Sequence, residues 1–213
     1  MLTRSFNKQF RYVIPVLLIV YLITFLSLLA AILASTMKGI SLDTLTKDPT
    51  QITNSPFYFG AFSNIGIMFW SGSVALCFFV AYRLSFVRSM SFQYLFMLLS
   101  GLVSLMLGID DLFQVHEYVS PHYFSIPKNA VFLTYANIIL IYLLYFRKLI
   151  LNTDYIVLAL AFIFMGLAAI SKIFPLPIPK DTFLEDALKL FGIVSWFFYY
   201  FRTSNQMISA SEH

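Results

Sequence analysis

Two short stretches of this chain gather side chains that could do chemistry. The first covers residues 110–117 and reads DDLFQVHE, and the second covers residues 185–192 and reads EDALKLFG. Carboxylates, amides, imidazoles and amines are the groups that bind cations and carry protons in proteins. Each stretch lies at the end of a long apolar run, where ionisable groups are costly. The candidate binding residues in them are Asp110, Asp111, Gln114, His116, Glu117, Glu185, Asp186 and Lys189.

Spacing in the first stretch leaves several chemistries open. If one helix continues through it, Asp110, Gln114 and Glu117 share a face, while Asp111 and His116 point elsewhere. Two carboxylates and an imidazole would suit a divalent metal or a proton relay, or would form ion pairs that only lock helices together. No metal signature as specific as HExxH is present. The candidate metal ligands are Asp110, Asp111, His116 and Glu117.

Lys189 is the most informative residue of the second stretch. Acids near a helix start are favoured by the helix dipole, so Glu185 and Asp186 also have a purely structural interpretation. Neither a cap nor the dipole favours a lysine early in a helix. We interpret Lys189 either as reaching outward to water or as the counter-ion of Asp110 or Asp111.

Composition places these residues in a membrane protein. The chain has 213 residues, of which 60% are hydrophobic and only 11% are charged, so it has too little polar surface to cover a soluble globule. Its net charge is +4, but the cations lie at the ends of apolar runs, which argues against nucleic-acid binding. The single cysteine, Cys77, lies inside an apolar run and is predicted to pack there.

Apolar run lengths predict an all-α, polytopic membrane protein. A helix crosses the hydrocarbon core in about 20 residues. The sequence therefore predicts one membrane domain over residues 1–213, built as a bundle of six transmembrane helices, with a loose polar tail after Arg202. The predicted spans are residues 12–34, 57–84, 92–113, 130–146, 155–174 and 183–201.

Charge distribution predicts the orientation. With both termini in the cytoplasm, every arginine lies on the cytoplasmic side, as the positive-inside rule favours. Most of the acids then lie on the opposite side, together with both polar stretches. The predicted location is the cell inner membrane, with multiple passes.

Some polar and small residues lie deeper in the predicted spans. Asn64 and Asn137 fall in the outer half of their spans, where they would line an outward-opening cavity or form interhelical hydrogen bonds. A small-residue surface on the third span is predicted to be a packing face, formed by Ser100, Gly101, Ser104 and Gly108.

The two stretches together form a recognisable pattern. Asp110-Asp111-Leu112-Phe113 with His116-Glu117 is a DDLFxxHE-like motif, and Glu185-Asp186 with Lys189 is an E(D/E)xxK-like motif. The pair resembles a pattern of uncharacterised multi-span bacterial inner-membrane proteins. This resemblance implies a membrane bundle over most of the chain and brings no known activity.

Three functional hypotheses follow. The first is binding or transport of a cation or small polar solute, with Lys189 competing for the carboxylates. The second is a metal-dependent intramembrane hydrolase acting on a lipid-type substrate, with His116 or Glu117 as general base and a divalent metal as cofactor. The third is a non-catalytic assembly subunit. The sequence leaves open whether the protein is an enzyme. The expected partners are the lipid bilayer, a cation or small solute, and a second copy or another membrane protein, with no nucleic acid.

Overall fold

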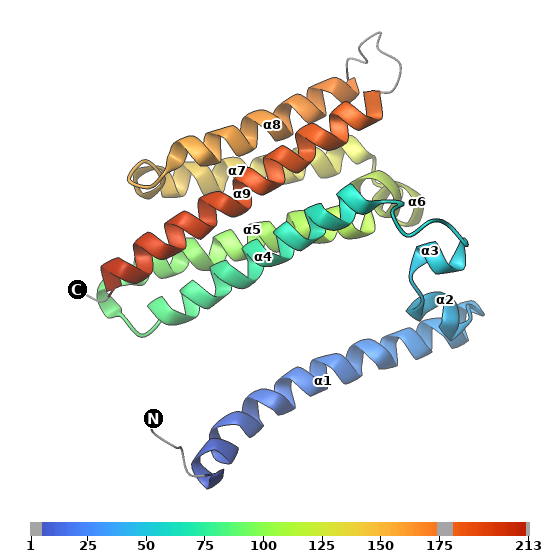
Figure 1. Ribbon diagram of the computed structural model, residues 1–213, viewed down its shortest axis with the longest axis horizontal. Coiled ribbons are helices and arrows are strands. Elements are labelled where there is room, and N and C mark those ends of the chain that lie inside the picture. The colour runs from blue at the N-terminus through green and yellow to red at the C-terminus, as the bar shows by residue number, and fades with distance from the viewer. Residues whose placement is uncertain (1–5, 174–180, 212–213) are drawn as a thin grey trace. The chain divides into compact units, whose positions relative to one another are not determined.

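The structure is a computed structural model that describes residues 6–173 and 181–211. The chain divides into two units, Met1–Phe59 and Gly60–His213. Throughout the described residues the regular structure is helical, with no strand (Figure 1). The all-α part of the prediction is therefore confirmed for these residues.

The first unit consists of one long apolar helix followed by two short helices. Its elements are α1 (Phe6–Lys38), α2 (Leu42–Thr46) and α3 (Pro49–Ile52). Apolar side chains of α1 are exposed on successive positions from Leu17 to Leu29. A helix that exposes apolar side chains on every side suits a lipid environment.

The connection after α1 contains ordered polar contacts. Asp48 caps α3 by accepting a hydrogen bond from the backbone N–H of Thr50 at 2.8 Å, and the Thr50 hydroxyl donates to the same oxygen. These hydrogen bonds favour the ionised carboxylate, so they hold the pKa of Asp48 below its usual range.

The second unit is a helical bundle in which α4 packs along both α5 and α9, and α8 packs along α9 (Figure 1). In this unit η2 is a single π-helical turn. The elements are α4 (Ala61–Leu84), η1 (Arg88–Met90), α5 (Ser91–Phe113), η2 (Val115–Val119), α6 (Ser120–Tyr123), α7 (Lys128–Ile150), α8 (Tyr155–Ile173) and α9 (Asp181–Ser211).

Aromatic rings and small residues form the core of this bundle. The rings of Trp70 on α4 and Trp196 on α9 are 5.8 Å apart, edge to face. Cys77 belongs to the same buried cluster and is fully buried, as predicted. A Cβ added at Gly101 would lie 2.6 Å from the ring of Phe78, so glycine permits the close approach of α5 to α4.

Four helices in the described part of the chain are long and apolar enough to cross a membrane. They lie within four of the six predicted spans or extend them by a few residues. The apolar stretches are Leu17–Lys38, Ala61–Leu84, Arg88–Phe113 and Lys128–Ile150.

The described parts of the helices in the last two predicted spans, α8 and α9, are not among those long and apolar enough to cross a membrane. The apolar part of α8 found in the described residues is Tyr155–Ile170, which is shorter than a full crossing, and residue 174 lies outside the described part of the chain. In α9, acids and Lys189 occupy one end and Arg202 interrupts the other. In the described residues, four of the six predicted spans therefore have a helix long and apolar enough to cross a membrane, and the count of six is not confirmed.

The tail after Arg202 differs from the prediction. It continues α9 as far as Ser211 instead of forming a loose segment. Asp154, in the turn before α8, accepts hydrogen bonds from Arg202 Nε at 2.6 Å and from Gln206 Nε2 at 3.0 Å. These contacts hold polar residues of the tail against the bundle, so a polar composition did not imply disorder here.

Candidate functional site

A carboxylate and an imidazole meet where α5 ends. The Asp110 carboxylate accepts a hydrogen bond from the backbone N–H of His116 at 2.9 Å, and its second oxygen lies 2.5 Å from His116 Nδ1. An ionised carboxylate only accepts hydrogen bonds, so the imidazole tautomer that suits this contact carries its hydrogen on Nδ1. The Asp110 side chain is only 10% exposed, so these contacts replace the water that it lacks.

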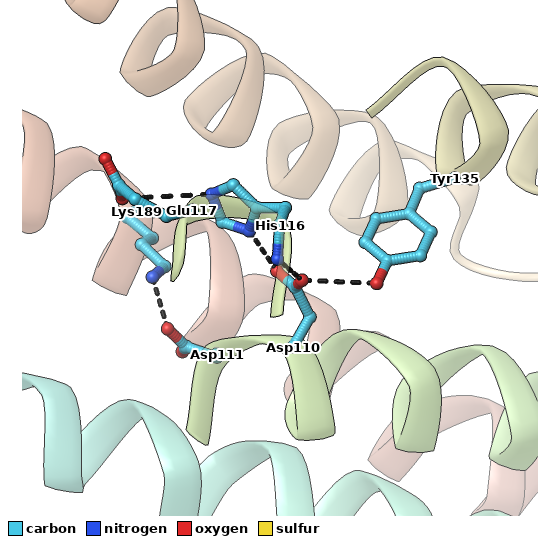
Figure 2. Close-up of polar contacts among 6 residues, drawn as sticks. All are labelled: Asp110, Asp111, His116, Glu117, Tyr135 and Lys189. Atoms are coloured by element: carbon cyan, nitrogen blue, oxygen red, sulfur yellow. Dashed lines mark hydrogen bonds and ion pairs between the residues drawn. The ribbon is translucent and has the colours of Figure 1, made fainter. Parts of the chain in front are cut away.

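An unusual backbone turn creates this contact. Helix α5 stops at Phe113, and Gln114 adopts a left-handed conformation with φ 51° and ψ 46°. The chain then makes the π-helical turn η2, which carries His116 back over Asp110 (Figure 2). On an uninterrupted helix, two residues six apart lie on different faces.

The predicted face of the first stretch is therefore wrong. It placed Asp110, Gln114 and Glu117 together and His116 elsewhere. In the structure His116 contacts Asp110 instead, and Gln114 is exposed at the turn. The prediction failed because it assumed regular helix across a residue that adopts a left-handed conformation.

Helix α7 closes the other side of this pair. The Tyr135 hydroxyl donates to Asp110 at 3.2 Å, and the Phe132 ring lies 4.3 Å from the imidazole of His116, centre to centre. The remaining ring nitrogen, Nε2, is 3.9 Å from the Glu117 carboxylate, which is 47% exposed (Figure 2). His116 is thus held at Nδ1, while its Nε2 faces an acid near solvent.

The second carboxylate joins two helices. Asp111 on α5 forms an ion pair with the Lys189 ammonium on α9 (Figure 2). The Asp111 side chain is 8% exposed, whereas the Lys189 side chain is 43% exposed. Gly66 on α4 lies alongside, since a Cβ placed there would be 3.7 Å from the Asp111 carboxylate. Of the two counter-ion assignments predicted for Lys189, the structure selects Asp111.

Other predicted binding residues do not join these contacts. Asn137 is exposed, and its amide donates to Leu133 of its own helix at 2.7 Å, while Asn64 is exposed near the start of α4. Asp186 is exposed and Glu185 is half-buried on the first turns of α9. Of the two roles predicted for these asparagines, cavity lining or interhelical hydrogen bonding, neither is supported for Asn137, whose amide bonds within its own helix.

Geometry argues against the predicted metal centre. Among the side chains that the structure describes, no three from His, Cys, Asp and Glu converge in a way that could hold a metal ion. The four predicted ligands divide into two groups, because Asp110 is engaged by His116 and Asp111 by Lys189. Each carboxylate already has a basic partner, and a metal would have to displace both.

Nothing in the sequence indicated that Tyr135 and Phe132 are members of this site. Both lie on the helix that carries Asn137, but neither has a spacing signal that separates it from the other aromatic residues of the chain. The resulting site contains two acid–base pairs, and the acids of the two pairs, Asp110 and Asp111, are adjacent on α5. Such pairs can exchange protons, or can exchange the basic partner for another cation.

Comparison with known proteins gives a family but no activity. Neither a curated protein nor a solved structure matches the chain. A family described as a domain of unknown function, DUF8692, matches residues 13–203, so this chain belongs to the DUF8692 family.

Proposed function

We propose that this protein binds, and moves across the membrane, a small cation or small polar solute at the site formed by Asp110, Asp111, His116 and Lys189. The observation that carries the proposal is the ion pair between buried Asp111 and half-exposed Lys189, which links α5 to α9. Ionisable groups at membrane depth are costly, and their presence between helices is typical of ion and solute pathways.

Binding could occur by exchange, with an arriving cation replacing the Lys189 ammonium at the Asp111 carboxylate. Lys189 has a flexible four-carbon stem, so its ammonium can swing toward solvent and release the Asp111 carboxylate. An arriving cation would then take the place of the ammonium and keep the buried charge compensated.

The proposal includes a topology. We infer that α8 and α9 also cross the bilayer, giving six spans in the inner membrane with both termini in the cytoplasm. The positions of the arginines support this orientation. It places the paired carboxylates near the outer face, where a solute from outside would meet them.

Equilibrium dialysis of the purified full chain against radiolabelled Na⁺, Ca²⁺ and methylammonium tests the proposal. We expect saturable binding of at least one of these probes, and we expect Asp111→Asn to weaken it by about tenfold or more through loss of the charge. Proteoliposomes loaded with the bound probe then test for movement across the membrane. Absence of saturable binding by the wild-type protein to all three probes would refute the proposal.

A further acid–base pair of the bundle, outside the candidate site, supplies a matched control. Asp154 pairs with Arg202, which lies 13 residues beyond Lys189 on the same helix, or about 20 Å away along its axis. Asp154→Asn makes the same chemical change as Asp111→Asn and should leave binding of the probe unchanged. Equal losses in both variants would indicate general damage to the bundle rather than a site at Asp111.

One observation favours a second candidate function, lipid hydrolysis. The Asp110 carboxylate fixes the orientation of the His116 ring and leaves Nε2 as the nitrogen that could accept a proton from water or a substrate hydroxyl. In this case His116 would act as general base. Release of fatty acid from a lipid ester or amide, lost in His116→Asn, would support this alternative.

A further inference from the structure

An apolar groove runs between α5 and α7. It has a volume of about 510 Å³, within the range of small-molecule pockets. Its floor includes Val103, Tyr142 and Phe146, which are all buried, while Leu102 and Ile141 stand exposed among its lining residues. Both helices are apolar and long enough to cross a membrane, so the surroundings of the groove are those of a lipid chain.

Tyr142 lies in the floor of the groove, but its hydroxyl is not available to a ligand. Its hydroxyl forms hydrogen bonds with Ser100 at 2.7 Å and with Tyr200 at 3.1 Å. Along α5 the groove extends from Leu95 to Met106, which corresponds to about 16 Å of helix. That length is close to half of the hydrocarbon core, so it suits one acyl chain of one leaflet.

The groove ends beside the polar site. Met106 lines the groove, and Asp110 follows it by one helical turn on α5. On the facing helix, Ile138 lines the groove, and Tyr135 precedes it by nearly one turn. Since Tyr135 donates to Asp110, the two helices meet at this end, about 6 Å beyond the last lining residue of α5.

Charge at this end selects the headgroup. Asp110 and Glu117 flank the His116 ring, so two carboxylates face one imidazole. Acidic groups therefore outnumber basic groups around this ring. A group that carries positive charge and donates hydrogen bonds would be attracted here, whereas a purely anionic headgroup would be repelled.

We propose that the groove holds an acyl chain of a membrane lipid whose headgroup bears a primary ammonium, and that this ammonium lies at Asp110, His116 and Glu117. This inference rests on the proposed function, because it names the cation of that site as part of an amphiphile. The apolar groove then binds the acyl chain, and the carboxylates select the headgroup.

Native mass spectrometry of the full chain in detergent tests the inference. The added probes are phosphatidylethanolamine and phosphatidylglycerol with identical acyl chains. We expect the wild-type protein to retain the ethanolamine lipid in preference. Leu102→Trp, which fills the groove, should reduce that retention by about tenfold or more. Glu117→Gln, at an exposed position, should reduce the preference for the ethanolamine lipid without loss of folding.

A matched control separates groove filling from general disturbance. Leu105 lies on the same helix, is 37% exposed and does not line the groove, so Leu105→Trp should retain lipid as the wild type does. Retention of lipid by Leu102→Trp at the wild-type level would overturn the inference. So would a dimer of the wild-type protein that only Leu102→Trp dissociates, because the groove would then bind a second copy of the chain.

Failure of this inference can be distinguished from failure of the proposed function. Methylammonium has no acyl chain, and its equilibrium dialysis does not depend on the groove. If Leu102→Trp loses the lipid but still binds methylammonium, both proposals are supported. If wild type and Leu102→Trp retain lipid equally and both bind methylammonium, the lipid inference is wrong and the proposed cation site remains.

Discussion

His116 returns to the carboxylate of Asp110, six residues earlier in the chain, because Gln114 between them leaves the helical conformation. The contact thus depends on a backbone conformation that costs about 1–2 kcal/mol for a residue with a side chain. Strain of this kind persists where surrounding contacts hold it, and here the hydrogen bonds to the Asp110 carboxylate do so. The site and the end of α5 are therefore a single structural feature.

Replacement of Gln114 tests this dependence. Gln114→Gly removes the steric cost of the left-handed conformation, so we expect the free energy of unfolding to rise by about 1 kcal/mol. Gln114→Val should lower it by about 1–2 kcal/mol, because a β-branched residue fits this conformation poorly. Reversible unfolding in mixed detergent micelles measures both changes.

Gln93 provides the control for this pair of variants. It lies near the start of α5, within the helix. At such a position Gln93→Gly should lower the free energy of unfolding by about 0.5–1 kcal/mol. If glycine has the same destabilising effect at both positions, the left-handed turn at Gln114 is not a source of strain.

The ion pair between Asp111 and Lys189 should respond asymmetrically to mutation. Lys189→Met leaves the buried Asp111 carboxylate without its ammonium, and a buried polar group left without its partner costs about 1–3 kcal/mol. Asp111→Asn leaves Lys189, whose half-exposed side chain can reach water, so the loss should be smaller. Unfolding measurements on the two single variants and the double variant give the comparison.

The double variant shows whether Asp111 and Lys189 stabilise the fold through their pairing. With both charges removed, Asp111→Asn with Lys189→Met should be more stable than Lys189→Met alone, since no uncompensated charge remains. A double variant that is less stable than either single variant would show that the two side chains contribute independently of each other.

Hydropathy predicted much of the fold, because apolar run length directly reflects the thickness of the bilayer. Composition and spacing alone predicted the four helices that are long and apolar enough to cross a membrane, the packing role of Cys77 and the small-residue face at Gly101. The extent of α9 did not follow, since it depends on the contact of Asp154 with a helix that starts 27 residues later in the chain.

The site was predicted in its residue types but not in its pairings. The sequence singled out Asp110, Asp111, His116 and Lys189 from their cost near a membrane. It did not assign His116 to Asp110, because the conformation of Gln114 is not visible in helical spacing. It also missed Tyr135, whose role depends on how α7 lies against α5.

Close packing of α8 and α9 gives a last prediction. A Cβ added at Gly192 would lie 2.5 Å from Met165 Cγ and 3.1 Å from the backbone oxygen of Ala161. Because a backbone atom cannot rotate away, Gly192→Ala should push α9 from α8 and lower the free energy of unfolding by about 1–3 kcal/mol. The shift would also disturb Lys189, which precedes Gly192 by less than one turn.

Gly166 on α8 offers the same substitution without the clash. No atom lies within 4 Å of a Cβ built there, so Gly166→Ala should be neutral or raise the free energy of unfolding by about 0.5–1 kcal/mol through helix propensity. Thermal unfolding of the two variants, together with methylammonium dialysis, checks both effects. Equal stability of Gly192→Ala and Gly166→Ala would show that α9 does not need this contact with α8 to hold Lys189 against Asp111.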